Sequence, residues 1–466
     1  MAQAFLPVWA VSCQNNTGRN ACATVSAPAS LRRVLGLWDL VFYGIIIIQP
    51  TAPMPLFGIV SEKAHGHVVT AVLIAMVAML FTAISYGKMA AAYPSAGSAF
   101  TYVGREINPA LGYITGWSMV LDYVMNPLIC TIWCSKAAGN FVPEIPYSAW
   151  AVFFIALFTM LNLRGVKASA RVNESLAVAM GVVILIFFAA AARYVLGHPG
   201  AQAWTRPFYD PATFQLRAVF TGTSIAALTY IGFDGVSTLA EEVRDPRRNI
   251  LRATVLVCLI TGALASAEVY MGQLVWPASK PFPDVDTAFS FIAGAAGGAA
   301  LFALVNFTLL VATIGSGSGT QLALARLLYG MGRSDALPRR FFGAIEPKRG
   351  IPRNNILAIC AVALVGALTM SYSLGAEMIN FGALLAFMGV NAAAFMRYYV
   401  RAEQKRWTML ASPALGFAFC FFIWLNLEWP AKLAGSVWMI AGIAYGAYRT
   451  KGFRRELVNF EGPLEE

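Results

Sequence analysis

The sequence predicts an all-α polytopic membrane protein with twelve transmembrane helices, and three observations lead to this prediction. First, 58% of the 466 residues are hydrophobic and only 12% are charged, which is too apolar for a soluble domain of this length. Second, the apolar residues gather in stretches of about 20, the length that a helix needs to cross a bilayer. Third, one stretch carries prolines near its middle, and another carries glycines and a carboxylate there. Membrane helices show such residues where they are broken around a buried cavity.

The chain alternates between apolar stretches and short polar segments. Twelve stretches are predicted to span the membrane: residues 40–61, 68–92, 108–135, 147–163, 173–193, 217–241, 252–275, 296–328, 354–374, 377–396, 408–427 and 431–448. Lysine and arginine gather in the alternate loops on the side of the N-terminus. Since cytoplasmic loops carry the excess of positive charge, both termini are expected in the cytoplasm. The formal net charge of +11 therefore reports orientation rather than nucleic-acid binding.

The first and the sixth stretch are predicted to be broken helices. In the first, the segment QPTAPMPLFG places Pro53 and Pro55 one residue apart, and a continuous helix cannot hold both because each removes a donor and clashes with the preceding turn. In the sixth, Gly232, Asp234 and Gly235 interrupt the apolar run. The two stretches are five apart and enter from opposite sides, so we expect a five-plus-five inverted repeat with a site at the midplane.

This repeat divides the chain into segments. We expect a disordered cytoplasmic tail over residues 1–30, a first repeat over 31–200, a second repeat over 201–402, two further helices over 403–450 and a cytoplasmic tail over 451–466. The N-terminal segment lacks the basic region and the continuous apolar core of a signal peptide.

Carboxylates at mid-depth in the predicted helices need a reason, because a charged side chain there costs at least roughly 2.5–3.5 kcal/mol. Asp234, at the break of the sixth stretch, either faces a cationic solute or coupling ion or caps the following half-helix by accepting backbone N–H bonds. Asp122 is the only charge between Ile107 and Ser135, and it is either functional or hydrogen-bonded to a neighbouring helix. Glu268 stands alone toward the outer end of the seventh stretch, where a structural role is favoured.

Other charges lie at the cytoplasmic ends of the predicted helices, where charge costs little. Asp39 and Glu174 are expected to be helix-end residues or gate partners. Glu241 and Glu242 precede Arg244, Arg247 and Arg248, and we expect cytoplasmic ion pairs here. Glu241, Glu242 and Arg244 are candidates for closing an inner gate.

Two further features of the sequence leave alternative roles open. Phe233, beside the break of the sixth stretch, either covers the site as a lid or packs in an aromatic cluster. The small residues of TIGSGSGTQ, Thr313–Gln321, either allow a close helix crossing, which we favour, or offer hydroxyls to a cation.

The sequence contains no Walker loop, GxSxG elbow or HExxH motif, so we predict neither an enzyme nor an ATP-driven pump, and we expect no cofactor or metal.

Five segments in order carry a resemblance to a known family. They are GLWDLVFYG (Gly36–Gly44), YPSAGSAFTYV (Tyr93–Val103), GYITGW (Gly112–Trp117), YIGFDGVSTLAEEVRDPRRNILRA (Tyr230–Ala253) and ARLLYGMGRSDALPRRF (Ala325–Phe341). With them the chain resembles the permeases of the amino acid-polyamine-organocation superfamily, and within it the bacterial putrescine importers. The resemblance implies twelve spans in a leucine-transporter-type inverted repeat, secondary active uptake by alternating access, and a bacterial-type plasma (inner) membrane.

The resemblance also implies a substrate site in three parts. Carried over by motif, the residues that contact the substrate are Gln49, Pro50, Thr51, Ala52 and Met54 in the first stretch, Asp122 and Tyr123 in the third, and Phe233 and Asp234 in the sixth. Asp122 and Asp234 are the candidates for carrying a coupling proton.

The first break favours an amine as the substrate. Many amino acid members of the superfamily have a glycine-rich break whose free N–H groups bind the substrate carboxylate, whereas PTAPMP contains three prolines, which have no N–H. The N–H groups of Met54, Leu56 and Phe57 still leave room for an amino acid.

We therefore expect an importer of a small amine, with putrescine favoured and H⁺ preferred over Na⁺ as the coupling ion. The alternative is an amino acid permease or exchanger, and a channel or membrane sensor is a distant third. The expected partners are the solute, the ion and the lipid bilayer, not nucleic acid, and the protein is expected to be a monomer or weak oligomer.

Overall fold

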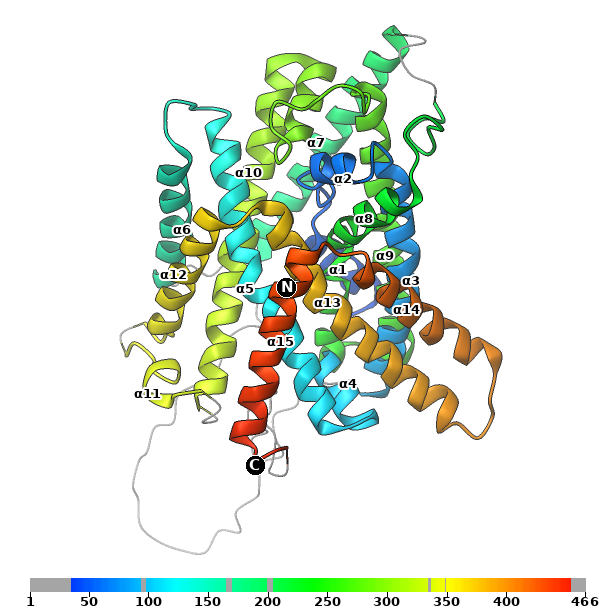
Figure 1. Ribbon diagram of the computed structural model, residues 1–466, viewed down its shortest axis with the longest axis vertical. Coiled ribbons are helices and arrows are strands. Elements are labelled where there is room, and N and C mark those ends of the chain that lie inside the picture. Colours follow the sequence, from blue (N-terminus) through cyan, green and yellow to red (C-terminus); the bar gives the residue numbers. More distant parts are fainter. Residues whose placement is uncertain are drawn as a thin grey trace, which may run out of the picture.

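The computed structural model describes residues 35–93, 98–164, 170–198, 204–333, 337–347 and 349–453, with the side chains of 170–176, 238, 240–242, 333 and 408 excepted. The segments predicted as tails, 1–30 and most of 451–466, lie outside this part, as do Pro94–Gly97 of one family motif. Within the described residues all regular secondary structure is helical, and the only β-pairing is two isolated bridges (Figure 1).

The helices follow one another along the chain with short connections. They are α1 (Leu37–Ile48), α2 (Phe57–Lys63), α3 (Val68–Ala92), α4 (Ser98–Glu106), α5 (Pro109–Gly139), α6 (Tyr147–Leu163), α7 (Ala170–Gly197), α8 (Leu216–Ala226), the 3₁₀ segments η1 (Ala227–Tyr230) and η2 (Phe233–Glu242), α9 (Pro246–Val275), α10 (Ala288–Arg333), α11 (Arg339–Phe342), α12 (Arg353–Thr369), α13 (Tyr372–Phe395), the π-helical η3 (Met396–Val400), α14 (Trp407–Leu425) and α15 (Trp429–Arg449).

Six helices in the described residues are long and apolar enough to cross a membrane. They are Val68–Ala92, Ala177–Gly197, Leu216–Ser237, Pro246–Val275, Ala288–Gly332 and Tyr372–Val400. A seventh candidate is the pair α14 and α15, which meet at 112°. α1, α6 and α12 are apolar but shorter. This composition is that of a polytopic membrane protein, as the sequence predicts.

Helix boundaries agree with the predicted stretches in some places and differ in others. α3 and α6 begin and end at the predicted residues. The tenth predicted stretch begins too late, because Ser371 accepts the N–H of Leu374 at 3.2 Å and starts α13 at Tyr372 rather than at residue 377. As a result, Glu377 lies inside a helix and not at its edge. α10 is much longer than predicted and bends at Gly298, whose φ of +77° is not helical.

The interruption predicted in the first stretch is present. α1 ends at Ile48, Gln49 has a positive φ of 69°, and a series of turns over residues 50–56 leads into α2 at Phe57. This interruption falls on the three prolines, as expected from their missing N–H groups.

The sixth stretch is interrupted as well, and it meets the first. The α-helix ends at Ala226, η1 follows, and Gly232 takes a φ of +122° before η2 begins. A side chain at Gly232 would be strained by this φ and would meet Ile47 at 2.9 Å. Gly235 also lies against Ile47. The two interruptions are therefore side by side.

α5 is the helix around which the candidate site is arranged. Asn108 caps it by accepting the N–H of Ala110 at 2.7 Å, and Pro109 occupies its first turn. Glycines of α13 allow α5 to approach closely, since a Cβ at Gly382 would lie 2.3 Å from the carbonyl oxygen of Ser118. This packing holds Asp122 near the middle of the bundle.

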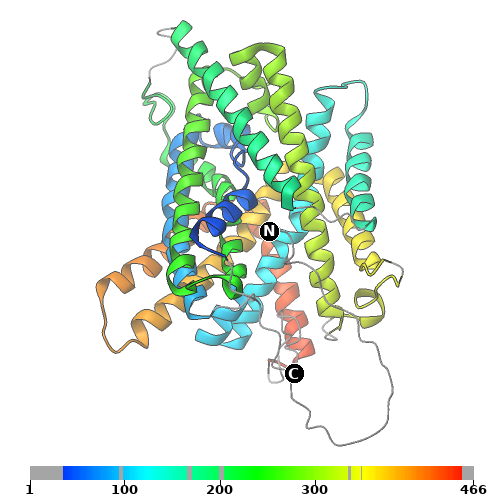
Figure 2. The ribbon, with the colours of Figure 1, turned by 180° about the vertical axis from the view of Figure 1, so that it is seen from behind.

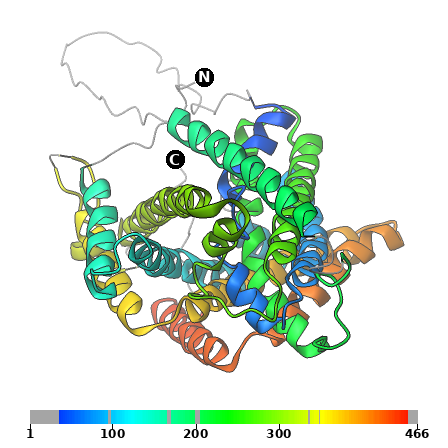
Figure 3. The same ribbon diagram turned by 90° about the horizontal axis from the view of Figure 1, so that it is seen from above.

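The remaining helices surround this centre. α7 crosses the bundle obliquely (Figure 2). α3 and α9 pack antiparallel, with Thr254 donating to the carbonyl of Ala83 at 3.2 Å. The hairpin of α13 and α14 projects beyond the other helices when the molecule is viewed from above (Figure 3).

Candidate functional site

Two carboxylates from different helices share one electrostatic environment at the centre of the bundle. Asp122 lies in the middle of α5 and Asp234 at the start of η2, and both side chains are half-buried. The charge of Asp234 acts on Asp122 and on Tyr123, the next residue of α5. Tyr123 is 36% exposed, so the space around these groups is open to solvent-sized molecules. The structure thus brings together three residues predicted for the site.

Asp234 has local hydrogen-bond donors as well as partial exposure. Backbone groups of Gly232 and Gly235 lie close to its carboxylate, and Ser237 donates to its carbonyl oxygen at 2.6 Å. Both roles considered for Asp234, helix capping and solute binding, stay predictions. A carboxylate accepts about four hydrogen bonds, so a half-exposed one that caps a helix start can also accept from a bound ammonium.

The interruption after α1 offers few backbone donors. Of the nine residues from Gln49 to Phe57, three are prolines, which leaves six N–H groups. Five of these are bonded within the chain: Gln49 to Ile45, Ala52 to Gln49, Met54 to Thr51, Leu56 to Pro53, and Phe57 to Met54, at 3.0–3.3 Å. The N–H groups of Met54, Leu56 and Phe57, which the sequence analysis left to a substrate carboxylate, are therefore already engaged.

The side chains of this interruption differ in their access. Thr51 is 2% exposed and its hydroxyl points to the sulfur of Met180, 3.6 Å away. Met54 is 1% exposed, and Pro50 is also buried. Gln49 and Ala52 are half-buried, and the Gln49 amide donates to the carbonyl of Ala312 in α10 at 3.4 Å. Gln49 and Ala52 are thus the predicted residues of this segment that retain access.

Phe233 is enclosed by other aromatic rings. Its side chain is fully buried, and its ring centroid lies 5.5 Å from that of Tyr86 and 5.3 Å from that of Phe387. Of the two roles considered for it, this conformation shows the aromatic packing.

The two interrupted stretches are joined at their other ends by backbone pairing. Leu35 and Val243 form a parallel bridge, and the N–H of Arg244 donates to the carbonyl of Leu35 at 2.9 Å. Asp39 accepts the N–H of Gly36 at 2.9 Å, which makes it a helix-end residue. We call this region the Leu35 end. The Arg244 side chain is exposed, whereas the side chains of the other gate candidates, Glu241 and Glu242, and that of Glu174 lie outside the described residues.

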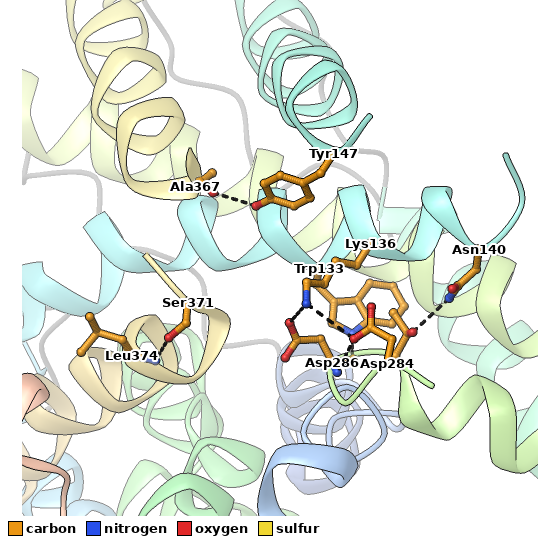
Figure 4. A network of polar contacts seen from close by, with 10 residues as sticks. Trp133, Lys136, Asn140, Tyr147, Asp284, Asp286, Ala367, Ser371 and Leu374 are labelled. Atoms are coloured by element: carbon orange, nitrogen blue, oxygen red, sulfur yellow. Dashed lines mark hydrogen bonds and ion pairs between the residues drawn. The ribbon is translucent and has the colours of Figure 1, made fainter. Parts of the chain in front are cut away.

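A polar network closes the opposite end of α5, which we call the Lys136 end (Figure 4). The ammonium of Lys136 lies 2.6 Å from Asp286 and 3.5 Å from Asp284. Trp133 donates to the carbonyl of Asp286 at 2.8 Å, and Asn140 donates to Thr287 at 3.0 Å. Burial raises the pKa of the Asp286 carboxyl, and the neighbouring ammonium offsets only part of this effect.

The segment that carries these aspartates is wedged against α2. A Cβ at Gly58 would lie only 2.0 Å from the carbonyl oxygen of Val285. Next to it, the ring of Phe289 lies 5.6 Å from Phe57 and 4.8 Å from Phe187. The Lys136 end is therefore closely packed, while the residues Asp122 and Asp234 are only half-buried.

Among the residues that the structure describes, three buried carboxyl groups lie outside this site. Glu106 accepts from Tyr93 and Arg397 at 2.6 Å and from Arg401 at 2.8 Å, which ties α4 to η3. Glu377 accepts the backbone N–H of Glu428 at 2.7 Å. Glu268 is fully buried, and neither of its oxygens has a partner in the described part of the chain.

Sequence reasoning missed the first two of these groups and the network at Lys136. Apart from Tyr93, which is 13 residues from Glu106, their partners lie 51 to 295 residues away, and no local pattern reveals such pairs. Among the described residues, no group of three or more His, Cys, Asp or Glu side chains is arranged to hold a metal ion.

Comparison with known proteins assigns the family. A family model described as "Amino acid permease" matches residues 54–452. The chain is 35% identical over 449 residues to the low-affinity putrescine importer PlaP of Escherichia coli (strain K12), covering 94% of this chain and 98% of that protein.

Two other relatives are more distant. The chain is 28% identical over 464 residues to the branched-chain amino acid permease BcaP of Bacillus subtilis (strain 168), covering 92% and 96% of the two chains. It is 27% identical over 395 residues to the vacuolar cationic amino acid transporter 4 of Arabidopsis thaliana, covering 80% and 64%. All three are transporters rather than enzymes, in agreement with the apolar helices of this chain. The chain is a multi-pass membrane protein that belongs to the amino acid permease family.

Proposed function

We propose that the protein imports a small amine, with putrescine as the favoured substrate, by proton-coupled secondary active transport. The observation that carries this proposal is the pair of half-buried carboxylates, Asp122 and Asp234, in one electrostatic environment. A diamine brings two ammonium groups, and two carboxylates in a partly desolvated space match them in charge and number. In this proposal Tyr123, Gln49 and Ala52, which are not fully buried, also contact the substrate. The buried side chains of Pro50, Thr51, Met54 and Phe233 would pack around the site.

The engaged N–H groups of the first interruption support an amine over an amino acid. An α-carboxylate would have to displace turn hydrogen bonds that Met54, Leu56 and Phe57 already make, and each displaced bond costs about 1 kcal/mol. The relative described as a putrescine importer agrees with this preference. The relative described as a branched-chain amino acid permease favours the alternative, an amino acid permease or exchanger.

The fold that we propose for this function has twelve spans. Residues 31–200 and 201–402 form two inverted five-helix repeats of the leucine-transporter type, 403–450 add two helices, and 1–30 and 451–466 are cytoplasmic tails. The distribution of lysine and arginine supports cytoplasmic termini in a bacterial-type plasma membrane.

In this orientation the Leu35 end faces the cytoplasm and the Lys136 end faces outward. We propose that the closely packed Lys136 end is the gate that is closed in this conformation. Alternating access requires the opposite state, in which the aspartates of the network separate from Lys136 and the solute enters from outside.

Proton coupling is the remaining part of the proposal. Asp122 and Asp234 carry the coupling proton because two carboxylates that share an environment do not both keep their charge without a cation between them. No cofactor takes part, and the functional unit is a monomer or a weak oligomer.

The test is uptake of radiolabelled putrescine into proteoliposomes with an imposed pH gradient, competed by unlabelled diamines, monoamines and neutral amino acids. We expect saturable uptake that diamines inhibit most strongly and that an acidic outside stimulates. Inhibition by leucine or alanine in preference to diamines would refute the amine assignment and support the amino acid permease.

A further inference from the structure

Glu268 differs from the other buried acids of the described residues. Glu106 and Glu377 are each 1% exposed, and both accept hydrogen bonds, from arginines and a tyrosine in the first case and from a backbone N–H in the second. Glu268 is 0% exposed, and both of its oxygens lack a partner within the part of the chain that the structure describes.

An ionised carboxylate cannot stay in such a place at an acceptable cost. Removing an unpaired charge from water costs several kcal/mol even after the protein relaxes, and the group then binds a proton instead. In the conformation seen here Glu268 is therefore the neutral acid. A purely structural carboxylic acid would use its O–H as a donor, as buried polar groups generally do, but this one has no acceptor among the described residues.

The position of Glu268 connects it to the seal at the Lys136 end. It lies four residues before Gly272, on the same face of α9. The ring atoms of Phe57 and Phe289 lie 3.2 Å from where a Cβ of Gly272 would be. Both phenylalanines belong to the contact between α2 and the start of α10. Glu268 is thus one helical turn away from the contact that must separate for this end to open.

No other charged group accounts for the state of Glu268. Titratable groups on the elements around this part of α9 include Lys63, His67, Tyr194, Tyr230 and Asp286. Each has a different neighbour: Lys63 pairs with Glu428, His67 accepts from the N–H of Asp210, Tyr194 stacks on His198, Tyr230 donates to Val72, and Asp286 pairs with Lys136. Neither carboxylate oxygen of Glu268 has a hydrogen-bond partner among the described residues.

We propose that Glu268 is a proton-binding site whose protonation permits the Lys136 end to close. When α2 and the start of α10 move away from Gly272, water reaches the preceding turn of α9, which carries Glu268. Glu268 then ionises, as an exposed glutamate does at neutral pH. Closure then requires the proton to return, because the sealed site has no partner for the charge. Acid on the outer side therefore favours closure and inward transport through a group that does not contact the substrate. This inference rests on the alternating access and orientation of the proposed function.

The test uses Glu268→Gln, which imitates the protonated acid in size and charge. Putrescine uptake into proteoliposomes is measured with an acidic and with a neutral outer medium at fixed internal pH. We expect the wild type to be faster in acid. Glu268→Gln should have a smaller ratio of acid to neutral uptake rates than the wild type, because its closure no longer waits for a proton and only the stimulation through Asp122 and Asp234 remains. A variant that keeps the acid stimulation of the wild type would overturn the proposal.

Glu377→Gln is the matched control, since Glu377 is equally buried but has a hydrogen-bond partner. Glu377→Gln should keep the acid stimulation of the wild type. If Glu377→Gln loses this stimulation as well, a specific role for Glu268 is contradicted. Size-exclusion chromatography of each variant shows whether it is folded.

A second measurement does not depend on the substrate. Infrared difference spectra between alkaline and acidic buffer should contain a carboxylic-acid C=O band that Glu268→Gln removes and Glu377→Gln retains. This band is expected even if putrescine is not transported, so a wrong substrate and a wrong proton site give different results. A Glu268 band that does not change with pH, or no such band, would refute the proton site.

Discussion

Replacing Asp122 by asparagine should weaken putrescine binding without disturbing the fold. Asparagine has nearly the same shape and can keep hydrogen bonds, so the change removes mainly the charge. Asp122 is half-buried and lies in the field of Asp234. An ammonium bound between them would lose one of its two carboxylates.

The size of the effect follows from the burial of the site. A hydrogen bond to a charged group contributes about 1.5–3 kcal/mol. Because Asp122 is partly exposed, we use this range for its interaction with an ammonium rather than the much larger interaction energy of a dry interior. Since every 1.4 kcal/mol changes affinity tenfold, the dissociation constant should rise by roughly 10- to 150-fold.

The assay is binding of radiolabelled putrescine to the purified protein in detergent, with butylamine as a competitor. Asp39→Asn is the control, because it removes the same charge at the Leu35 end, where Asp39 caps α1. If each carboxylate holds one ammonium, a monoamine should be weakened by only one of Asp122→Asn and Asp234→Asn, whereas putrescine is weakened by both. Unchanged putrescine binding in Asp122→Asn, or an equal loss in Asp39→Asn, would refute the paired-carboxylate site.

Three further predictions concern stability. Gly232→Ala should lower the free energy of unfolding by about 1–3 kcal/mol, because its φ of +122° is strained for any side chain; thermal unfolding checks this, and the open helical site Gly181→Ala should show no loss. As pH rises, Asp286→Asn should become more stable relative to the wild type, because burial raises the pKa of Asp286 in the folded protein and its ionisation then destabilises the wild type. A difference in melting temperature between the two proteins that is the same at acidic and neutral pH would contradict this. Glu106→Gln should cost about 1–3 kcal/mol by depriving Arg397 and Arg401 of their partner, and an unchanged melting temperature would show that the pairs contribute nothing.

The sequence by itself determined the features that depend on local composition. Length and apolarity predicted a polytopic helical protein, and the boundaries of α3 and α6 agree with the prediction to the residue. Prolines and glycines marked both interruptions, because a missing N–H or a positive φ excludes a regular helix whatever its neighbours. Asp122 and Asp234 stood out because a carboxylate in an apolar run is costly. Their role in substrate binding stays a prediction.

Only the tertiary structure decided which distant groups meet. The N–H groups of Met54, Leu56 and Phe57 bond within their own turns, and Phe233 is covered by rings from α3 and α13. Lys136 reaches aspartates that lie about 150 residues further along the chain. These outcomes depend on how the helices pack, because a hydrogen bond or ion pair forms with whichever group is brought within reach. A single sequence does not contain that proximity, since the same apolar periodicity is compatible with many helix arrangements.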